Sequence, residues 1–179
     1  MDEVLILVDQ YDHAIGVGNK LQVHQDGVLH RAFSIFIFDS DGRLLLQQRA
    51  KDKYHSGGLW TNTCCGHPRH GENNDDAAHR RLMEEMGFDC PLQEVAAITY
   101  RASVSNHLIE HEFDHIYVGR FNSEPVPNPD EASNWFWIAT PALLEWIAVQ
   151  PQVFTVWFIK ILNEAGDGCL EVWKSYVQK

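Results

Sequence analysis

Positive charge is scarce in this chain. Its 179 residues include 14 Lys and Arg against 25 Asp and Glu, which gives a formal net charge of −11 at pH 7. A protein that covers the phosphates of a nucleic acid or of an anionic membrane needs an excess of basic side chains. We therefore expect no nucleic acid and no membrane as partner. A small anionic substrate would have to be held by a few cations gathered in one pocket.

Cysteines and long apolar runs are also few. The four cysteines include the adjacent pair Cys64 and Cys65 and no Cys-x-x-Cys motif, so the pattern indicates neither a zinc ribbon nor a disulfide framework. The apolar run at residues 4–8 is too short for a signal-peptide core or a membrane span, and we expect it to form a strand. These absences predict a cytoplasmic protein.

Length and hydrophobic pattern predict one domain, residues 1–179, with an α/β (α+β) fold. The sequence leaves the oligomeric state open, and we expect a monomer or weak homodimer. The turn sequence from Asp39 to Gly42 favours a hairpin, because Gly accepts the positive φ of such turns. We expect a mixed sheet packed against helices. Strand-like runs lie at 4–8, 32–38, 44–46, 98–100, 116–118 and 135–138, and helical patterns at about 75–86, 141–149 and 152–165.

The clearest helix, at about 75–86, carries charged residues at informative spacing. It is preceded by Asn73 and followed by Gly87, residue types that favour the two ends of a helix. Positions four apart share a helical face, so Arg81 and Glu85 are expected to point together into a cleft. With its flanks, the segment resembles the Nudix box, which holds a divalent metal against a diphosphate, at Gly66, Glu72, Arg80, Leu82, Glu84, Glu85, Gly87 and Phe88.

One position departs from the pattern of Nudix hydrolases. Where those enzymes carry a metal-binding glutamate directly after the box arginine, this chain has Arg81. A hydrolase activates water with clustered carboxylates around its metals. Replacing one carboxylate by a cation favours an enzyme that binds the diphosphate and leaves it intact.

The flanking segments resemble a narrower family, the type I isopentenyl-diphosphate delta-isomerases of the Nudix superfamily. The similarity lies in LWTNTCCGHP at 59–68, HRAFS at 30–34, YRA at 100–102 and EHE at 110–112, and it extends to Trp157. The resemblance implies a Nudix-type mixed β-sheet sandwich flanked by helices. It also implies an isomerase of isoprenoid biosynthesis, which interconverts isopentenyl diphosphate and dimethylallyl diphosphate by protonating and deprotonating carbon.

Histidines and glutamates provide candidate metal ligands. His24, His30 and His67 offer imidazole nitrogens, and Glu110 and Glu112 lie two apart in an expected strand, so they share one face. This donor set suits Zn²⁺ or Mn²⁺. The resemblance places that metal on all five residues and a Mg²⁺ ion, bridging the diphosphate, on Glu85. The other histidines are expected to be ordinary surface or core residues: His13, His55, His70, His79, His107, His111 and His115.

The same resemblance identifies catalytic and substrate-binding residues. Cys65 and Glu112 are the expected acid and base on opposite faces of the alkene, with Tyr100 as a hydrogen-bond partner that tunes Glu112. We expect cationic neighbours to lower the pKa of Cys65. Trp157 would stabilise positive charge on carbon. The diphosphate would be held by cations on several segments, namely Lys20, Arg49, Lys53 and Arg81.

Two other functions are consistent with parts of this pattern. A Nudix diphosphohydrolase would share the helix and its metal, but it would not need Cys65, Tyr100 and Glu112. A zinc-stabilised binding module could use the Cys64 to His67 cluster and would unfold on chelation. The sequence leaves open the native metal at the histidine site, the direction of flux, the role of Cys64, and whether Cys65 or Glu112 delivers the first proton.

Overall fold

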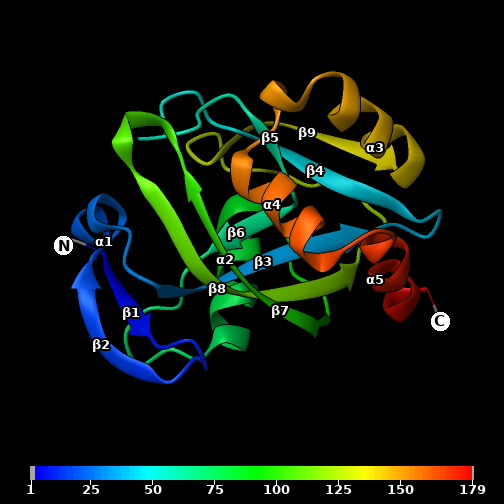
Figure 1. Ribbon diagram of the computed structural model, residues 1–179. Helices are drawn as coiled ribbons and strands as arrows, with labels where there is room; N and C mark the ends of the chain where they lie inside the picture. Colours follow the sequence, from blue (N-terminus) through cyan, green and yellow to red (C-terminus); the bar gives the residue numbers. More distant parts are fainter. Residues whose placement is uncertain (1–2, 179) are drawn as a thin grey trace.

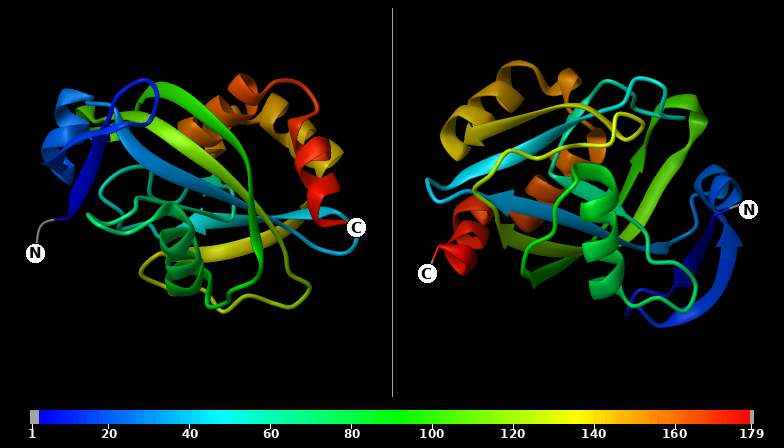
Figure 2. Two further views of the ribbon diagram at one scale, coloured as in Figure 1. Left: turned by 90° about the horizontal axis from the view of Figure 1, so that it is seen from below. Right: turned by 180° about the vertical axis from the view of Figure 1, so that it is seen from behind.

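The computed structural model describes residues 3–178. Figure 1 shows a curled sheet with α3, α4 and α5 toward one side and α2 behind it, and Figure 2 shows α2 from the opposite direction. The elements in chain order are β1 (Val4–Val8), β2 (Ala14–Asn19), α1 (Lys20–Asp26), β3 (His30–Phe38), β4 (Arg43–Arg49), β5 (Trp60–Thr61), β6 (Cys64–Gly66), α2 (Asn74–Met86), β7 (Leu92–Ser103), η1 (Ser105–His107), β8 (Ile109–Arg120), β9 (Ala132–Ala139), α3 (Thr140–Val149), η2 (Pro151–Val153), α4 (Val156–Ala165) and α5 (Cys169–Val177).

Strand β3 is the centre of the sheet. It runs parallel to β8 along its whole length and antiparallel to β1, β4 and β6. On the far side of β8, β7 continues the sheet, and on the far side of β4 lies β9. One strand therefore carries β6 on one edge and β8 on the other, which places residues from distant parts of the chain side by side.

Two apolar cores cover the two faces of β3. Phe36 and Phe38 belong to the core beneath α4 and α5, whereas Phe33, Ile35 and Ile37 belong to the core beneath α2. Successive side chains of a strand point to opposite faces, so this alternation follows directly from the sequence of β3. Residues 32–38 of the strand are apolar except for Ser34 because both faces of the strand are buried.

Local sequence explains where the central helix begins and ends. The side chain of Asn73 accepts a hydrogen bond from the Asp76 amide at the start of α2, and Gly87 ends the helix at φ 74°. A Cβ atom at Gly87 would lie 2.2 Å from the Val126 carbonyl oxygen, so only glycine allows the loop before β9 to pack there. The predicted hairpin from Asp39 to Gly42 is confirmed as the turn between β3 and β4.

The predicted fold class is confirmed, and several element boundaries were wrong. The strands predicted at 98–100 and 116–118 are the middles of twelve-residue strands β7 and β8. The helix predicted from 152 starts at Val156, after the short η2 turn. The predictions omitted α1, β2, β5, β6 and α5. Among the residues described, no helix has the length and apolar character needed to cross a membrane.

Candidate metal and catalytic site

One cavity of about 180 Å³ brings the predicted functional groups together. Its wall contains a thiol, several carboxylates, four cationic side chains and an indole. Three catalytic candidates, Cys65, Tyr100 and Glu112, line it together with the predicted Mg²⁺ ligand Glu85. The remaining lining residues are Glu3, Lys20, Arg49, Lys53, Tyr54, His55, Gly66, His67, Arg81, Glu110, Glu131 and Trp157.

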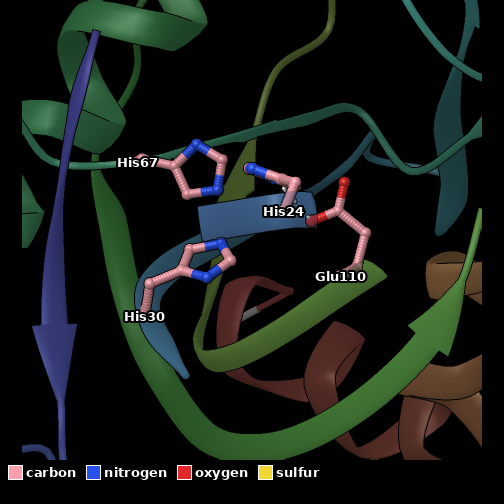
Figure 3. Close-up of side chains that lie close together, drawn as sticks. All are labelled: His24, His30, His67 and Glu110. Atoms are coloured by element: carbon pink, nitrogen blue, oxygen red, sulfur yellow. Dashed lines mark ion pairs between the residues drawn. The ribbon is translucent and has the colours of Figure 1, made fainter. Parts of the chain in front are cut away.

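A group of donors suited to a metal adjoins this cavity, and two of its members, His67 and Glu110, line the cavity wall. One ligand atom from each of His24, His30, His67 and Glu110 lies within 4.8 Å of the others. Figure 3 shows the imidazole rings and the carboxylate of Glu110 directed toward one another from separate segments of the chain. They come from α1, the start of β3, the loop after β6 and β8, so the curled sheet assembles the group.

In two of these rings, Nδ1 already has a hydrogen-bond partner. Nδ1 of His24 lies 2.6 Å from the Lys20 carbonyl and Nδ1 of His30 lies 2.9 Å from the Val28 carbonyl. A carbonyl oxygen only accepts, so both Nδ1 atoms carry hydrogen and both Nε2 atoms face inward with a lone pair in the neutral ring. His24 Nε2 lies 3.0 Å from Glu110 Oε2 and His30 Nε2 lies 3.6 Å from Glu112 Oε1, so buried nitrogens and carboxylate oxygens face one another, which fits a metal site.

Glu112 joins this group to the catalytic end of the cavity. Its Oε1 lies 3.0 Å from His67 Nε2 and 3.6 Å from His30 Nε2, while its Oε2 accepts a hydrogen bond from the Tyr100 hydroxyl. Burial and Glu110 raise the pKa of Glu112, but the interactions with His30 and His67 outweigh them and lower it. Burial and the charge of Glu112 raise the pKa of Tyr100, so the phenol remains a donor.

Cys65 lies on the same face of the sheet as Glu112, on β6. Its thiol donates to Asn62 Oδ1 at 3.1 Å and lies 3.5 Å from Ser34 Oγ. The expectation of a lowered pKa was wrong: burial and the nearby Asp114 raise the pKa of Cys65 to about 12. The cations of the cavity lie close to carboxylates instead of sulfur, so the thiol keeps its proton in the free protein.

The four predicted substrate-binding cations all line the cavity. Arg49 stacks on Trp157 with 5.0 Å between the guanidinium carbon and the ring centroid. Lys53 and Arg81 both contact Glu131, and Arg81 also pairs with Glu85. Lys20 pairs with Glu3 at 2.7 Å. Within residues 3–178, each of these cations except Arg49 thus has a carboxylate partner.

Helix α2 presents Arg81 and Glu85 to the cavity, as their spacing predicts. Arg81 contacts Glu84 at 2.8 Å and Glu85 more closely, and Gln47 from β4 donates to Glu85 Oε2 at 2.8 Å. Arg80, on the neighbouring face, pairs instead with Glu72 of the preceding loop. One arginine therefore fastens the loop to the helix, and the next one faces the site.

Sequence reasoning missed His55 and Glu131. His55, which was expected to be a surface or core residue, is buried, lines the cavity, lies 3.1 Å from Glu110 Oε1 and packs edge-on against Trp157. Glu131 lies in the loop before β9 and pairs with Lys53 and Arg81, two predicted diphosphate-binding cations. The only signal for His55 in the sequence was its place two residues after Lys53.

The fold and the helix that carries Arg81 and Glu85 define the class of protein. Residues 28–158 match the NUDIX domain family, and the chain belongs to the Nudix superfamily. Two solved structures share the fold. A Deinococcus radiodurans protein superposes with a TM-score of 0.70 at 20% identity over 99% of this chain and 100% of its own. A MutT protein from Methanosarcina mazei superposes with a TM-score of 0.61 at 12% identity, over 84% and 96%.

Curated relatives identify the branch of the superfamily. The Isopentenyl-diphosphate Delta-isomerase of Serratia proteamaculans is 59% identical over 173 residues, 97% of each chain. Isopentenyl-diphosphate Delta-isomerase 2 of Photorhabdus laumondii is 54% identical over 177 residues, 99% of this chain and 100% of its own. This chain belongs to the isopentenyl-diphosphate Delta-isomerases, and it is an enzyme.

Proposed function

We propose that this chain interconverts isopentenyl diphosphate and dimethylallyl diphosphate inside the 180 Å³ cavity, with Cys65 and Glu112 as the groups that exchange protons with carbon. The observation that supports this most strongly is that the sulfur and the carboxylate line one cavity together with the cationic end. A hydrolase needs a carboxylate-bound metal and a water, whereas a thiol and a tyrosine-bonded carboxylate are typical of proton transfer.

The diphosphate end of the substrate would lie among Lys20, Arg49, Lys53 and Arg81. These are the cations that line the cavity in a chain of net charge −11. Arg81 stands where a hydrolase would carry another metal-binding carboxylate, so it adds positive charge without helping to activate water. In the free protein, ion pairs with Glu3, Glu85 and Glu131 would hold the cationic side chains in place. The diphosphate would replace some of these carboxylates when it binds.

The hydrocarbon end would lie between Cys65 and Glu112, next to the indole of Trp157. One group adds a proton to the alkene, and the other removes a proton from the carbon on the far side of the developing cation. Because the reaction is reversible, the group that is acid in one direction is base in the other. The indole face stabilises positive charge on carbon by about 0.5 to 2 kcal/mol.

The residues present fit a divalent metal at the histidine site. His24, His30, His67 and Glu110 would hold it, with Glu112 beside them, and three nitrogens with carboxylate oxygen suit Zn²⁺ or Mn²⁺. Within the part of the chain that the structure describes, this group contains no cysteine, which argues against the zinc module built on Cys64 and Cys65. Glu85 would hold Mg²⁺ together with the diphosphate. Bound metal would supply positive charge that orients Glu112 and neutralises phosphate.

An isotope experiment tests the reaction. Purified protein is incubated with isopentenyl diphosphate and Mg²⁺ in deuterated water, and the products are analysed by mass spectrometry and for free phosphate and pyrophosphate. We expect dimethylallyl diphosphate that carries deuterium, with no phosphate released. Free phosphate or pyrophosphate without isomer would contradict the proposal and favour the diphosphohydrolase.

Removing metal should abolish turnover and leave the protein folded. Both faces of β3 are covered by apolar cores that do not depend on the histidine group. We therefore expect a chelated sample to keep its far-UV circular dichroism and cooperative melting while activity disappears. Adding Zn²⁺, Mn²⁺ and Mg²⁺ singly and in pairs would then identify the native metal. A sample that unfolds on chelation would instead support a structural zinc module.

A further inference from the structure

Asp114 is a buried carboxyl group that none of the roles above uses. It lies on β8 two residues after Glu112, on the same face of the strand, and its side chain is fully buried. Oδ2 accepts a hydrogen bond of 2.8 Å from Ser34 Oγ, and Oδ1 has no hydrogen-bond partner. A buried carboxyl with one unpaired oxygen destabilises the fold, so its presence calls for another explanation.

Ser34 connects this carboxyl to the reactive sulfur. In the sheet Ser34 pairs with Cys65 of β6 on one side and with Ile116 of β8 on the other. Its Oγ therefore lies between Asp114 and the sulfur of Cys65, 2.8 Å and 3.5 Å away. A hydroxyl has one hydrogen, and in the arrangement in which Ser34 gives it to Asp114, Ser34 accepts from the thiol.

Asn62 supplies the second contact of the thiol. Its Nδ2 donates to the carbonyls of Ile35 and Cys64 at 3.1 and 2.9 Å, which fixes the amide so that Oδ1 faces the sulfur at 3.1 Å. The thiol of Cys65 thus meets two acceptors and no donor among these neighbours. Its position and the direction of its hydrogen are set by Ser34 and Asn62.

We propose that Ser34 and Asp114 are positioning residues for Cys65. Asp114 accepts the hydroxyl hydrogen of Ser34 and so keeps that hydrogen directed away from the sulfur until the thiol has lost its proton to carbon. When the proton leaves sulfur, the Ser34 hydroxyl can rotate and donate to the thiolate. No covalent bond to either residue forms or breaks. The inference rests on the proposed role of Cys65.

The test compares Ser34→Ala, Asp114→Val and Asp114→Asn in the full-length, metal-loaded enzyme. We expect kcat to fall about tenfold or more in Ser34→Ala and Asp114→Val, with KM for isopentenyl diphosphate unchanged, because the diphosphate contacts remain. Asp114→Asn should recover most of kcat, since its amide oxygen can still accept from Ser34. Asp114→Val should melt at the same or a higher temperature, because it replaces an incompletely paired buried carboxyl by an apolar side chain of similar volume.

Asp39→Asn is the matched control. Asp39 is also a buried carboxyl, but it lies beyond the other end of β3, where it accepts from the backbone and side chain of Arg43. We expect it to lower the melting temperature and leave kcat within about threefold of wild type. The proposal is overturned if Ser34→Ala and Asp114→Val keep near-normal kcat, or if kcat falls only in step with melting temperature, as a purely structural role requires. Normal deuterium incorporation by wild type would show that the proposed function survives such a failure.

Discussion

Replacing Cys65 by Ala should lower kcat by at least about 10³-fold while the protein stays folded, because the change removes one of the two proposed proton-transferring groups from the cavity. KM should change little, since the sulfur does not belong to the cationic end of the cavity. The measurement is a steady-state assay of isomer formation beside a thermal melt. Removing this half-buried sulfur leaves only a small cavity, so the melting temperature should change little.

Cys90→Ala is the matched control for this substitution. Burial raises the pKa of both thiols to about 12, but Cys90 does not line the cavity. It should keep kcat within about threefold of wild type. A Cys65→Ala enzyme with a near-normal rate would remove the thiol from the mechanism, even though the chain remains a member of the isomerase family.

Replacing Glu112 by Gln should also lower kcat, by about 10³-fold or more. The amide keeps the size of the carboxylate and an oxygen that can accept from Tyr100, but it cannot bind and release a proton. The substitution also removes the negative charge of Oε1, which lies 3.6 Å from His30 Nε2 and 3.0 Å from His67 Nε2, so metal affinity should fall. The assay should be run at saturating metal, with bound metal measured by elemental analysis.

Tyr100→Phe separates the proton-transfer role of Glu112 from its role beside the metal. It removes only the hydroxyl that donates to Oε2 and leaves the carboxylate beside the histidines. We expect a smaller loss, about 10- to 100-fold in kcat, with normal metal content. If Glu112→Gln recovers full activity once metal is saturated, Glu112 acts only through the metal and the proposed acid-base pair is wrong.

The sequence was most informative where short segments carry several functional residues. Arg81 and Glu85 share a helical face by spacing alone, and the caps at Asn73 and Gly87 locate the helix. Strand β3 was predictable because residues 32–38 are apolar except for Ser34. Strand β8 was recognised only in part, because Glu110, Glu112 and Asp114 occupy inward positions where an ordinary strand would carry apolar residues.

Contacts that depend on strand register could not be predicted. Asp114 lies near Cys65 only because β3 pairs with β6 on one edge and runs parallel to β8 on the other. The pKa of Cys65 was predicted in the wrong direction for a related reason. The cationic residues line the same cavity, but carboxylates such as Glu85 and Glu131 pair with them, and burial of the sulfur and the nearby Asp114 raise the pKa of the thiol.

A crystal structure of the Cys65→Ser enzyme with isopentenyl diphosphate and its metals is the most direct test of the account. We predict the serine oxygen and a Glu112 oxygen within about 4 Å of the carbon chain on opposite faces, with the diphosphate among Lys20, Arg49, Lys53 and Arg81. A hydrocarbon chain bound outside the cavity, or one that meets both groups on the same face, would contradict it.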